Sequence, residues 1–325
     1  MRPVEKILVR LNGLQYPQEY LCLDKKSFSP ILKAYLTDGN RIIKNITDAH
    51  LFTGYSPLIF TLASDHADDN LLAERIELLF THKSLGKNEI LPSTVAAAGL
   101  RLKRIHVQPV NGTFLFLYEG EKGWHRFIPR IGQWAGQLRN KLFNKKPGNV
   151  FLQGNLYRQV QLAYAIPRKI CLVTVGEDNL YNIFPTDLHG AVNDSVYVMS
   201  LRHEGRACSQ VEAAGRIVLS EMEPQACKRI FSLGKNHMQP LKESTSFDLD
   251  GHSSRHFQLP LPKDAVAYFE LELISAFTHG IHKLLFFKII GREELDTRAG
   301  TLAHIHNTYA TWRHKNGLKS NYILR

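Results

Sequence analysis

Two stretches of this chain repeat one pattern. Residues 31–62 align with residues 170–201 without a gap, and seven of the 32 positions are identical. The polar sequence Thr-Asp-x-His occurs in both stretches, at 47–50 and at 186–189. Because strand periodicity concerns only apolar positions, it does not explain a polar match. The repeat therefore predicts two similar domains in one chain, meeting near residues 148–157.

Short runs typical of β-strands dominate the sequence. The clearest are residues 170–175, 195–201, 215–222, 265–277 and 283–290. They are β-branched or aromatic and are bounded by turn-forming residues, as strands are. Helical patterns are fewer, and the expected helical segments are 70–80, 125–146 and 222–234, while 235–262 is expected to be a long loop. The sequence thus predicts a mostly β protein with accessory helices.

The length of 325 residues suits two domains, which we expect at residues 1–150 and 151–325. The four cysteines contain no C-x-x-C pair, so neither a disulfide framework nor a cysteine-based zinc site is expected. Two histidine pairs, 304/306 and 279/282, invite a metal hypothesis, but no third ligand follows from their spacing, so no metal is predicted. No apolar run has the length of a secretory signal or a membrane span, which predicts a cytoplasmic location.

Positive charge is concentrated in the first half of the chain. The net charge is +11, and residues 125–146 contain six Lys or Arg residues and no acid. Such a segment suits nucleic acid or an anionic membrane surface. The interpretation favoured by helical spacing is a helix that packs on a core through Ile131, Trp134, Leu138 and Leu142. We therefore expect neither a nucleic-acid nor a membrane partner.

The second copy contains a strand-turn-strand pattern, then two further strands with a helix between them, and a later hairpin. The residues that mark this pattern are Val173, Thr174, Asn182, Thr186, Ser200, Leu201, Arg202, Ser209, Gly215, Arg216, Val218, Gly280 and His282. Through them, residues 157–300 resemble the flavin reductase-like, FMN-binding split-barrel family. The chain departs from the family at Asp187, Leu188 and His189, and at Ile281, where the family has an acid.

The resemblance implies tandem split β-barrels that form a pseudo-dimer within one chain, as a monomer or in a homodimer. It also implies FMN as cofactor, NAD(P)H as reductant, and an oxidoreductase that passes hydride through the flavin to an acceptor. The flavin supplies the redox chemistry in such proteins, so no catalytic residue is required from the chain. His189 is the one weak catalytic candidate.

A flavin phosphate needs several converging hydrogen-bond donors. The second copy has hydroxyl, imidazole and guanidinium donors at its strand ends and turns. The expected cofactor-binding residues are Phe184, Pro185, Thr186, Asp187, Leu188, His189, Ser200, Leu201, Arg202, Arg206, Ser209 and His282. Phe184, Pro185 and Leu188 would contact the flavin ring, and Arg202 would be the main phosphate partner. The first copy has Ala63 at the position of Arg202. We therefore expect one functional site, built mostly by the second half.

Other functions stay open on the sequence alone. A non-catalytic flavin-binding protein would keep the same barrel, and the changes at 187–189 and 281 agree with it. The fifteen histidines also suit a haem-handling or pyridoxamine-oxidase-like split barrel. A basic surface-binding module is a third alternative.

Overall fold

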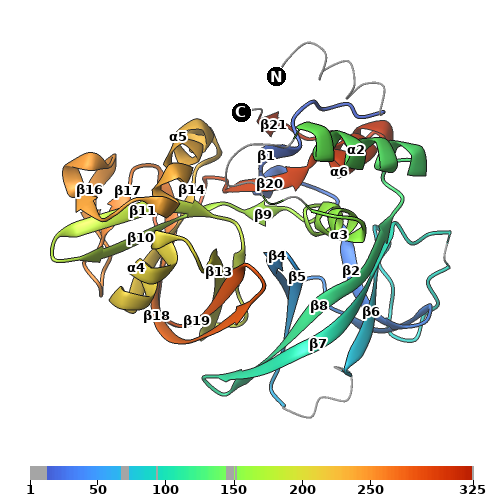
Figure 1. Cartoon of the computed structure of the whole chain (residues 1–325), viewed down its shortest axis with the longest axis horizontal. Coiled ribbons are helices and arrows are strands. Elements are labelled where there is room, and N and C mark those ends of the chain that lie inside the picture. The colour runs from blue at the N-terminus through green and yellow to red at the C-terminus, as the bar shows by residue number, and fades with distance from the viewer. Residues whose placement is uncertain (1–12, 67–72, 93, 144–149, 151, 324–325) are drawn as a thin grey trace.

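The protein is built mostly from β-strands, as the sequence predicts. The computed structural model describes residues 13–66, 73–92, 94–143, 150 and 152–323 (Figure 1). Two large antiparallel sheets, one from each half of the chain, contain most of the strands, and a small third sheet lies between them. Of the helices in these residues, none has the length and apolar character needed to cross a bilayer.

The first large sheet has seven strands in the order β3-β2-β6-β7-β8-β5-β4. The bounds are β2 Lys33–Asp38, β3 Arg41–Asn45, β4 His50–Tyr55, β5 Leu58–Ser64, β6 Arg75–Thr81, β7 Ala98–Val110 and β8 Thr113–His125. Phe60, Phe80 and Phe116 are fully buried in its core. Helix α2 (Arg130–Phe143) follows β8, and the end of the expected 125–146 helix lies outside the described residues.

The second large sheet has eight strands in the order β12-β13-β19-β18-β14-β10-β11-β15. The bounds are β10 Cys171–Glu177, β11 Leu180–Thr186, β12 His189–Ala191, β13 Val196–Arg202, β14 Arg216–Met222, β15 Lys242–Glu243, β18 Ala265–His279 and β19 His282–Glu294. Helix α4 (Arg206–Ala214) connects β13 to β14, and α5 (Cys227–Ser232) confirms the helical pattern at 222–234. The expected loop at 235–262 also contains the short strands β16 (Leu249–Ser253) and β17 (Pro260–Pro262).

The two large sheets share one strand order. Read from β3 to β4, the first sheet matches the second read from β11 to β12. The equivalent strands are β2 and β10, β3 and β11, β4 and β12, β5 and β13, β6 and β14, β7 and β18, and β8 and β19. Within the described residues the strands at the ends of this series, β3 with β4 and β11 with β12, do not pair, so each sheet stays open as in a split barrel.

The prediction of a helix over residues 70–80 is wrong. Residues 75–81 form β6, which pairs with β2 on one side and β7 on the other, and residues 70–72 lie outside the described part. The run Arg-Ile-Glu-Leu-Leu-Phe-Thr fits both a helical and an alternating pattern. Its two strand neighbours satisfy its backbone groups, and this tertiary pairing decides between the two patterns.

The third sheet brings together segments from both ends of the chain. Its order is β21-β1-β20-β9, with bounds β21 Tyr322–Ile323, β1 Tyr20–Asp24, β20 Leu302–His306 and β9 Arg168–Lys169. Helix α3 (Asn155–Ala163) packs on β8, and α6 (Asn307–Lys315) follows β20. Residues of β1, α3, β20 and α6 share one core with the first large sheet. The division at residue 150 remains a prediction, because the chain passes between the two parts more than once.

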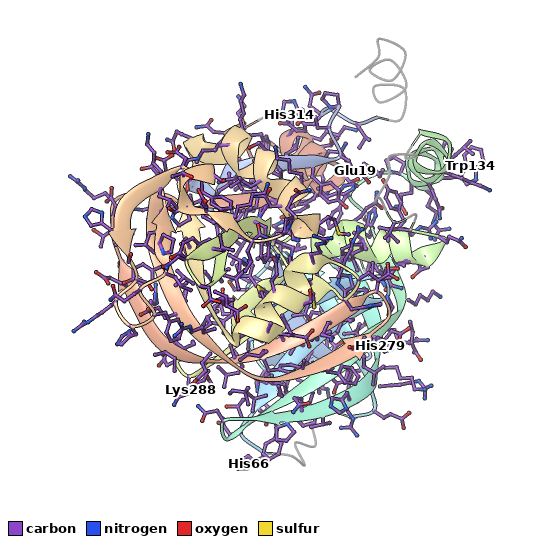
Figure 2. The ribbon with its side chains drawn as sticks, turned by 60° about the vertical axis from the view of Figure 1, so that its left-hand side comes forward. Glu19, His66, Trp134, His279, Lys288 and His314 are labelled. Carbon is purple, nitrogen blue, oxygen red and sulfur yellow. The ribbon has the colours of Figure 1, made fainter. Side chains whose placement is uncertain are left out.

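The two large sheets pack together through equivalent residues. Their shared apolar cluster contains the pairs Ile59 and Val196, Leu115 and Leu284, and Leu117 and Phe286. The members of each pair hold matching positions, because the β5–β8 ladder and the β13–β19 ladder have the same register. Nearby, His279 of β18 is hydrogen-bonded to Glu119 of β8 at 2.7 Å (Figure 2). Equivalent surfaces that meet each other are the mark of a two-fold interface, here within one chain.

Candidate functional site

The polar turn after β11 lies against the end of β13, as expected. The amide of Ser200 donates to the carbonyl of Leu188 at 2.8 Å, and His189 pairs with Met199 in the β12–β13 ladder. Thr186 and Ser200 are both buried. The structure therefore brings the predicted residues 186–189 and 200–202 together at one edge of the second sheet.

Arg202 is exposed and is held by a side chain of the first half. Its Nε and Nη2 donate to the hydroxyl of Tyr55 at 2.8 and 2.5 Å, and its guanidinium lies 5.7 Å from the Tyr55 ring centroid. Burial raises the pKa of Tyr55, and Arg202 opposes that effect. Because the phenol stays neutral near pH 7, its own proton is free to donate to another acceptor. The first half thus provides one wall of this site.

Helix α4 begins shortly after Arg202. Its N-cap residue, Gly205, provides no side-chain capping bond, and the Gly205 amide donates to the carbonyl of Arg202 at 3.0 Å. Arg206, the first helical residue, is exposed. Ser209 is also exposed, but its hydroxyl donates to the carbonyl of Arg206 at 2.9 Å. Two guanidinium groups and an uncapped helix start are therefore neighbours in the chain.

His282 joins this edge of the sheet to Tyr55. The amide of Tyr55 donates to His282 Nε2 at 3.2 Å, so Nε2 is an acceptor and the neutral ring carries its proton on Nδ1. Nδ1 lies 3.1 Å from Ser200 Oγ and donates to it. Burial, and then the charge of Arg202, lowers the pKa of His282 to about 4. The predicted residues Ser200 and His282 form a neutral, ordered pair at pH 7.

Asp187 binds residues that the sequence analysis did not assign to the site. Its carboxylate accepts hydrogen bonds from the Tyr164 hydroxyl at 2.9 Å and from His304 Nδ1 at 3.0 Å. Its backbone carbonyl accepts from Arg168 Nε at 3.1 Å. Burial raises the pKa of Asp187, but the bond and charge of His304, with Arg168 and Tyr164, outweigh burial and lower that pKa to about 2.

Arg168 also reaches the first half of the chain. It is buried, it donates through Nη2 to the carbonyl of Phe52, and it lies 5.5 Å from the Phe52 ring. No local pattern marks Arg168, Tyr164 or Tyr55 as site residues. His304 was noticed only as half of a histidine pair, and the structure gives it a carboxylate partner instead. Within the described residues no group of three possible metal ligands occurs.

The remaining predicted residues lie deeper in the fold. Phe184 and Leu201 are buried in the core of the second sheet. His189 is buried, with Nδ1 hydrogen-bonded to the Tyr197 hydroxyl at 2.7 Å, and burial lowers its pKa to about 4. His189 Nε2 has no hydrogen-bond partner among the described residues. The carbonyl of Pro185 accepts from His237 Nε2 at 2.8 Å, and His237 was not predicted.

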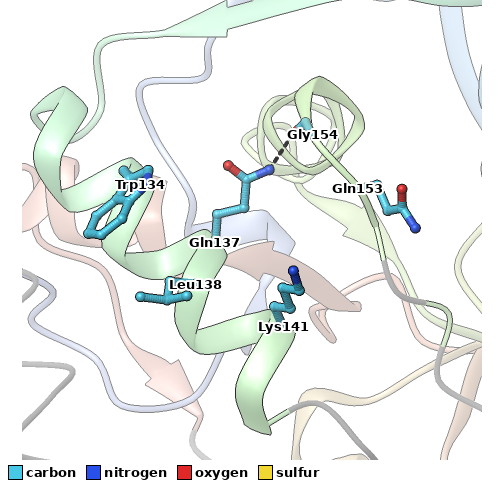
Figure 3. Close-up of a pocket in the computed structure, with 6 residues that line it drawn as sticks. All are labelled: Trp134, Gln137, Leu138, Lys141, Gln153 and Gly154. Atoms are coloured by element: carbon cyan, nitrogen blue, oxygen red, sulfur yellow. Dashed lines mark hydrogen bonds between the residues drawn. The ribbon is translucent and has the colours of Figure 1, made fainter.

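A cavity of about 360 Å³ lies elsewhere, beside α2. It is lined by Trp134, Gln137, Leu138, Lys141, Gln153 and Gly154, and Gln137 donates to the carbonyl of Gly154 at 2.8 Å (Figure 3). None of these residues belongs to the predicted flavin site.

Comparison with family models gives one match in this chain. Residues 163–313 match the family model described as flavin reductase like domain. No curated protein matches the chain in sequence. One similar solved structure is the C-1027 NADH:FAD oxidoreductase SgcE6 of Streptomyces globisporus. The two sequences are 15% identical, and the match covers 50% of this chain and 96% of that chain, with a TM-score of 0.42.

Two further structures are similar to the chain. One is BorF, the flavin reductase component of a bacterial two-component tryptophan halogenase, with 18% identity, 46% and 92% of the two chains covered, and a TM-score of 0.40. The other is an FMN-binding protein of Thermus thermophilus with bound 1-cyclohex-2-enone, with 20% identity, 40% and 71% covered, and a TM-score of 0.34.

Proposed function

Residues 163–313 belong to the flavin reductase-like family of flavin-dependent oxidoreductases, and we propose that this protein binds FMN and passes hydride from NAD(P)H to an acceptor. The bound flavin would accept and donate the hydride. The chain's own residues would bind the phosphate, order the turn beside it and shield the site. The observation that carries this proposal is the group of donors at the start of α4, within the matched residues.

The donor set fits a phosphate. The planar guanidinium of Arg202 suits a phosphate and is already oriented by Tyr55. The start of α4 offers backbone amides without a capping side chain, and Arg206 adds a second exposed guanidinium. Helix starts with free amides are suited to anions. We assign the phosphate of FMN to Arg202, Arg206 and the first amides of α4.

Neighbouring residues order this edge of the sheet. Asp187 fixes the turn after β11, because its carboxylate and carbonyl together accept from three side chains. The Asp187 carboxylate is therefore hydrogen-bonded to Tyr164 and His304. His282 and Ser200 pair with each other in the neutral state, so they add no charge next to the phosphate. His189 retains one free ring nitrogen and stays the candidate for contact with the flavin ring.

We further propose that the two halves arose by duplication and that only one kept a site. The shared strand order and the equivalent interface residues support duplication. The first half keeps Asp48 and His50, but at the position of Arg202 it has Ala63 in the sequence alignment and Asp65 in the register of the strand ladders. Neither residue has a guanidinium, so that half lacks the strongest phosphate partner. The chain would then act as a pseudo-dimer with one FMN.

Titration of the purified protein with FMN, followed by flavin fluorescence, tests the proposal. Arg202→Ala should weaken FMN binding roughly tenfold to a hundredfold, because a bond to a charged group contributes about 1.5–3 kcal/mol. Tyr55→Phe should weaken it less, since the guanidinium is retained. Asp65→Arg is the matched control, because Asp65 is exposed and holds the equivalent ladder position in the first half, and it should leave binding unchanged. Equal affinity of the wild type and Arg202→Ala would remove the assignment of the phosphate.

Two further measurements separate the alternatives. NAD(P)H oxidation by the FMN-loaded protein is expected, and tight binding of FMN without oxidation would indicate a non-catalytic flavin-binding protein. The absorption spectrum of the freshly purified protein should show oxidised flavin. A Soret band there would instead indicate a haem-handling protein.

A further inference from the structure

Helix α2 carries an apolar stripe on its solvent side. Ile131 is 83% exposed, Trp134 63% and Leu138 41%. Their spacing of three and four residues places them on one face of the helix. The sequence interpretation that these residues pack on a core is therefore wrong. Figure 2 shows Trp134 at the edge of the molecule, directed away from the sheets.

The opposite face of α2 is the one that packs on the protein. Gly132, Gln133 and Gly136 are buried, and the Gln133 side-chain amide donates to the carbonyls of His125 and Ile128, both at 3.0 Å. The Gln133 side chain therefore ties this face of the helix to the segment that precedes it. These hydrogen bonds fix the rotation of α2 about its axis. The apolar stripe therefore faces outward.

Positive charge lies beside the stripe on the helix itself. Arg130 and Lys141 are exposed, and Lys141 lies with Trp134 and Leu138 at the cavity of about 360 Å³ (Figure 3). Among its described side chains, the exposed face of α2 thus combines an indole and two aliphatic groups with two cations and no acid.

We propose that α2 docks the protein on an anionic membrane surface, lying flat with Ile131, Trp134 and Leu138 in the headgroup region. A helix with aromatic and aliphatic residues on one face and basic residues beside them is typical of interfacial membrane binding. Tryptophan favours the boundary between headgroups and acyl chains. The expectation of no membrane contact depended on burying this stripe in the core, and the exposure of the stripe removes that basis.

Other occupants fit the surface less well. A second copy of the chain would bring the same cations against the stripe, and like charges oppose each other. Nucleic acid would use the basic residues, but it has no need of two exposed aliphatic side chains. A protein partner would bury about 800 Å² on each side in a standard interface, which three side chains do not supply. An anionic bilayer uses both the apolar and the positive part of the surface.

Vesicle co-sedimentation of the full chain tests the proposal. We expect binding to vesicles of phosphatidylcholine with phosphatidylserine, weaker binding to pure phosphatidylcholine, and release as salt screens the charges. The double variant Ile131→Ser/Trp134→Ser should bind at least about tenfold less, because it removes most of the apolar contact. Ile90→Ser is the matched control, since Ile90 is 67% exposed and lies outside α2, and it should bind like the wild type.

Charge and fluorescence provide independent readouts. Arg130→Glu/Lys141→Glu should abolish the preference for anionic vesicles, and the tryptophan emission should shift to the blue on binding in the wild type but not in Trp134→Phe. Absence of binding to anionic vesicles at low salt would overturn the proposal. Binding that ignores lipid charge, or a dimer in solution that the Ile131/Trp134 double variant dissociates, would overturn it as well.

Discussion

Replacement of Asp187 by asparagine should lower the free energy of unfolding at pH 7. The carboxylate accepts bonds from Tyr164 and His304, and asparagine keeps the shape but loses the charge. A bond to a charged group exceeds a neutral one by about 1 kcal/mol, which gives a loss of about 2 kcal/mol for two bonds. Asp48, the equivalent residue of the first half, is exposed and has no hydrogen bond to its side chain among the described residues. Asp48→Asn should change stability by less than about 0.5 kcal/mol.

The lowered pKa of Asp187, whose causes include these same two hydrogen bonds, agrees with this magnitude. That pKa is about 2 in the folded protein against an ordinary value of 3.8, and the difference corresponds to roughly 2 kcal/mol. A carboxyl whose pKa is lowered on folding stabilises the fold above its ordinary pKa, and this contribution is lost as the pH falls through about 2. The gap between the wild type and Asp187→Asn should therefore shrink below about pH 4.

Urea unfolding followed by circular dichroism measures these differences. Both variants and the wild type would be compared at pH 7, and the comparison repeated toward acid pH. If Asp187→Asn unfolds at the same urea concentration as Asp48→Asn, with equal slopes, the two charge-assisted bonds do not stabilise the fold and the reasoning fails.

Two further predictions concern glycine and histidine. Gly280 has a φ of +58°, and a Cβ at this position would lie 2.3 Å from Pro57 Cδ and 2.4 Å from Ser56 O. Gly39 has nearly the same φ, +57°, but a Cβ there would meet open space. Gly280→Ala should therefore lower the melting temperature several degrees more than Gly39→Ala, and equal melting temperatures would contradict the contact between the halves. Burial, in each case the largest cause, lowers five histidine pKa values from 6.5 to about 4, those of His50, His82, His125, His189 and His282. Because the unfolded chain then binds more protons, the free energy of unfolding should fall as the pH decreases from about 7 to about 5, and an unchanged urea midpoint would oppose this.

The correspondence between the two halves was predictable because it shows in the sequence as a repeat. That repeat places four strands of each half in correspondence, whereas the order in which they pair is known only from the structure. The segment 75–81 was not predictable, since its apolar positions suit two periodicities and only its neighbours β2 and β7 decide. Local pattern therefore predicts a strand well where it alternates strictly, and poorly where it does not.

The candidate site was predictable only where the chain folds back on itself nearby. Residues 186–189 and 200–202 meet because one short hairpin connects them. Tyr55 and His304 reach the same place from 147 and 117 residues away, and no spacing rule links them to it. Helix α2 shows a related limit: its periodicity predicts an apolar face, while the hydrogen bonds of Gln133 to His125 and Ile128 decide which face packs.

The pairing of β1 with β20 also bears on how the protein is made. Tyr20 lies opposite His306, so β1 gains this neighbour only after residues up to His306 have been synthesised. At about 5–20 residues per second, the ribosome would need roughly 15–60 s to deliver that partner. During this time β1 and the surface it later covers would have to be kept from pairing with other nascent chains, so this protein's yield in the cell should depend on chaperones that hold the emerging amino-terminal half.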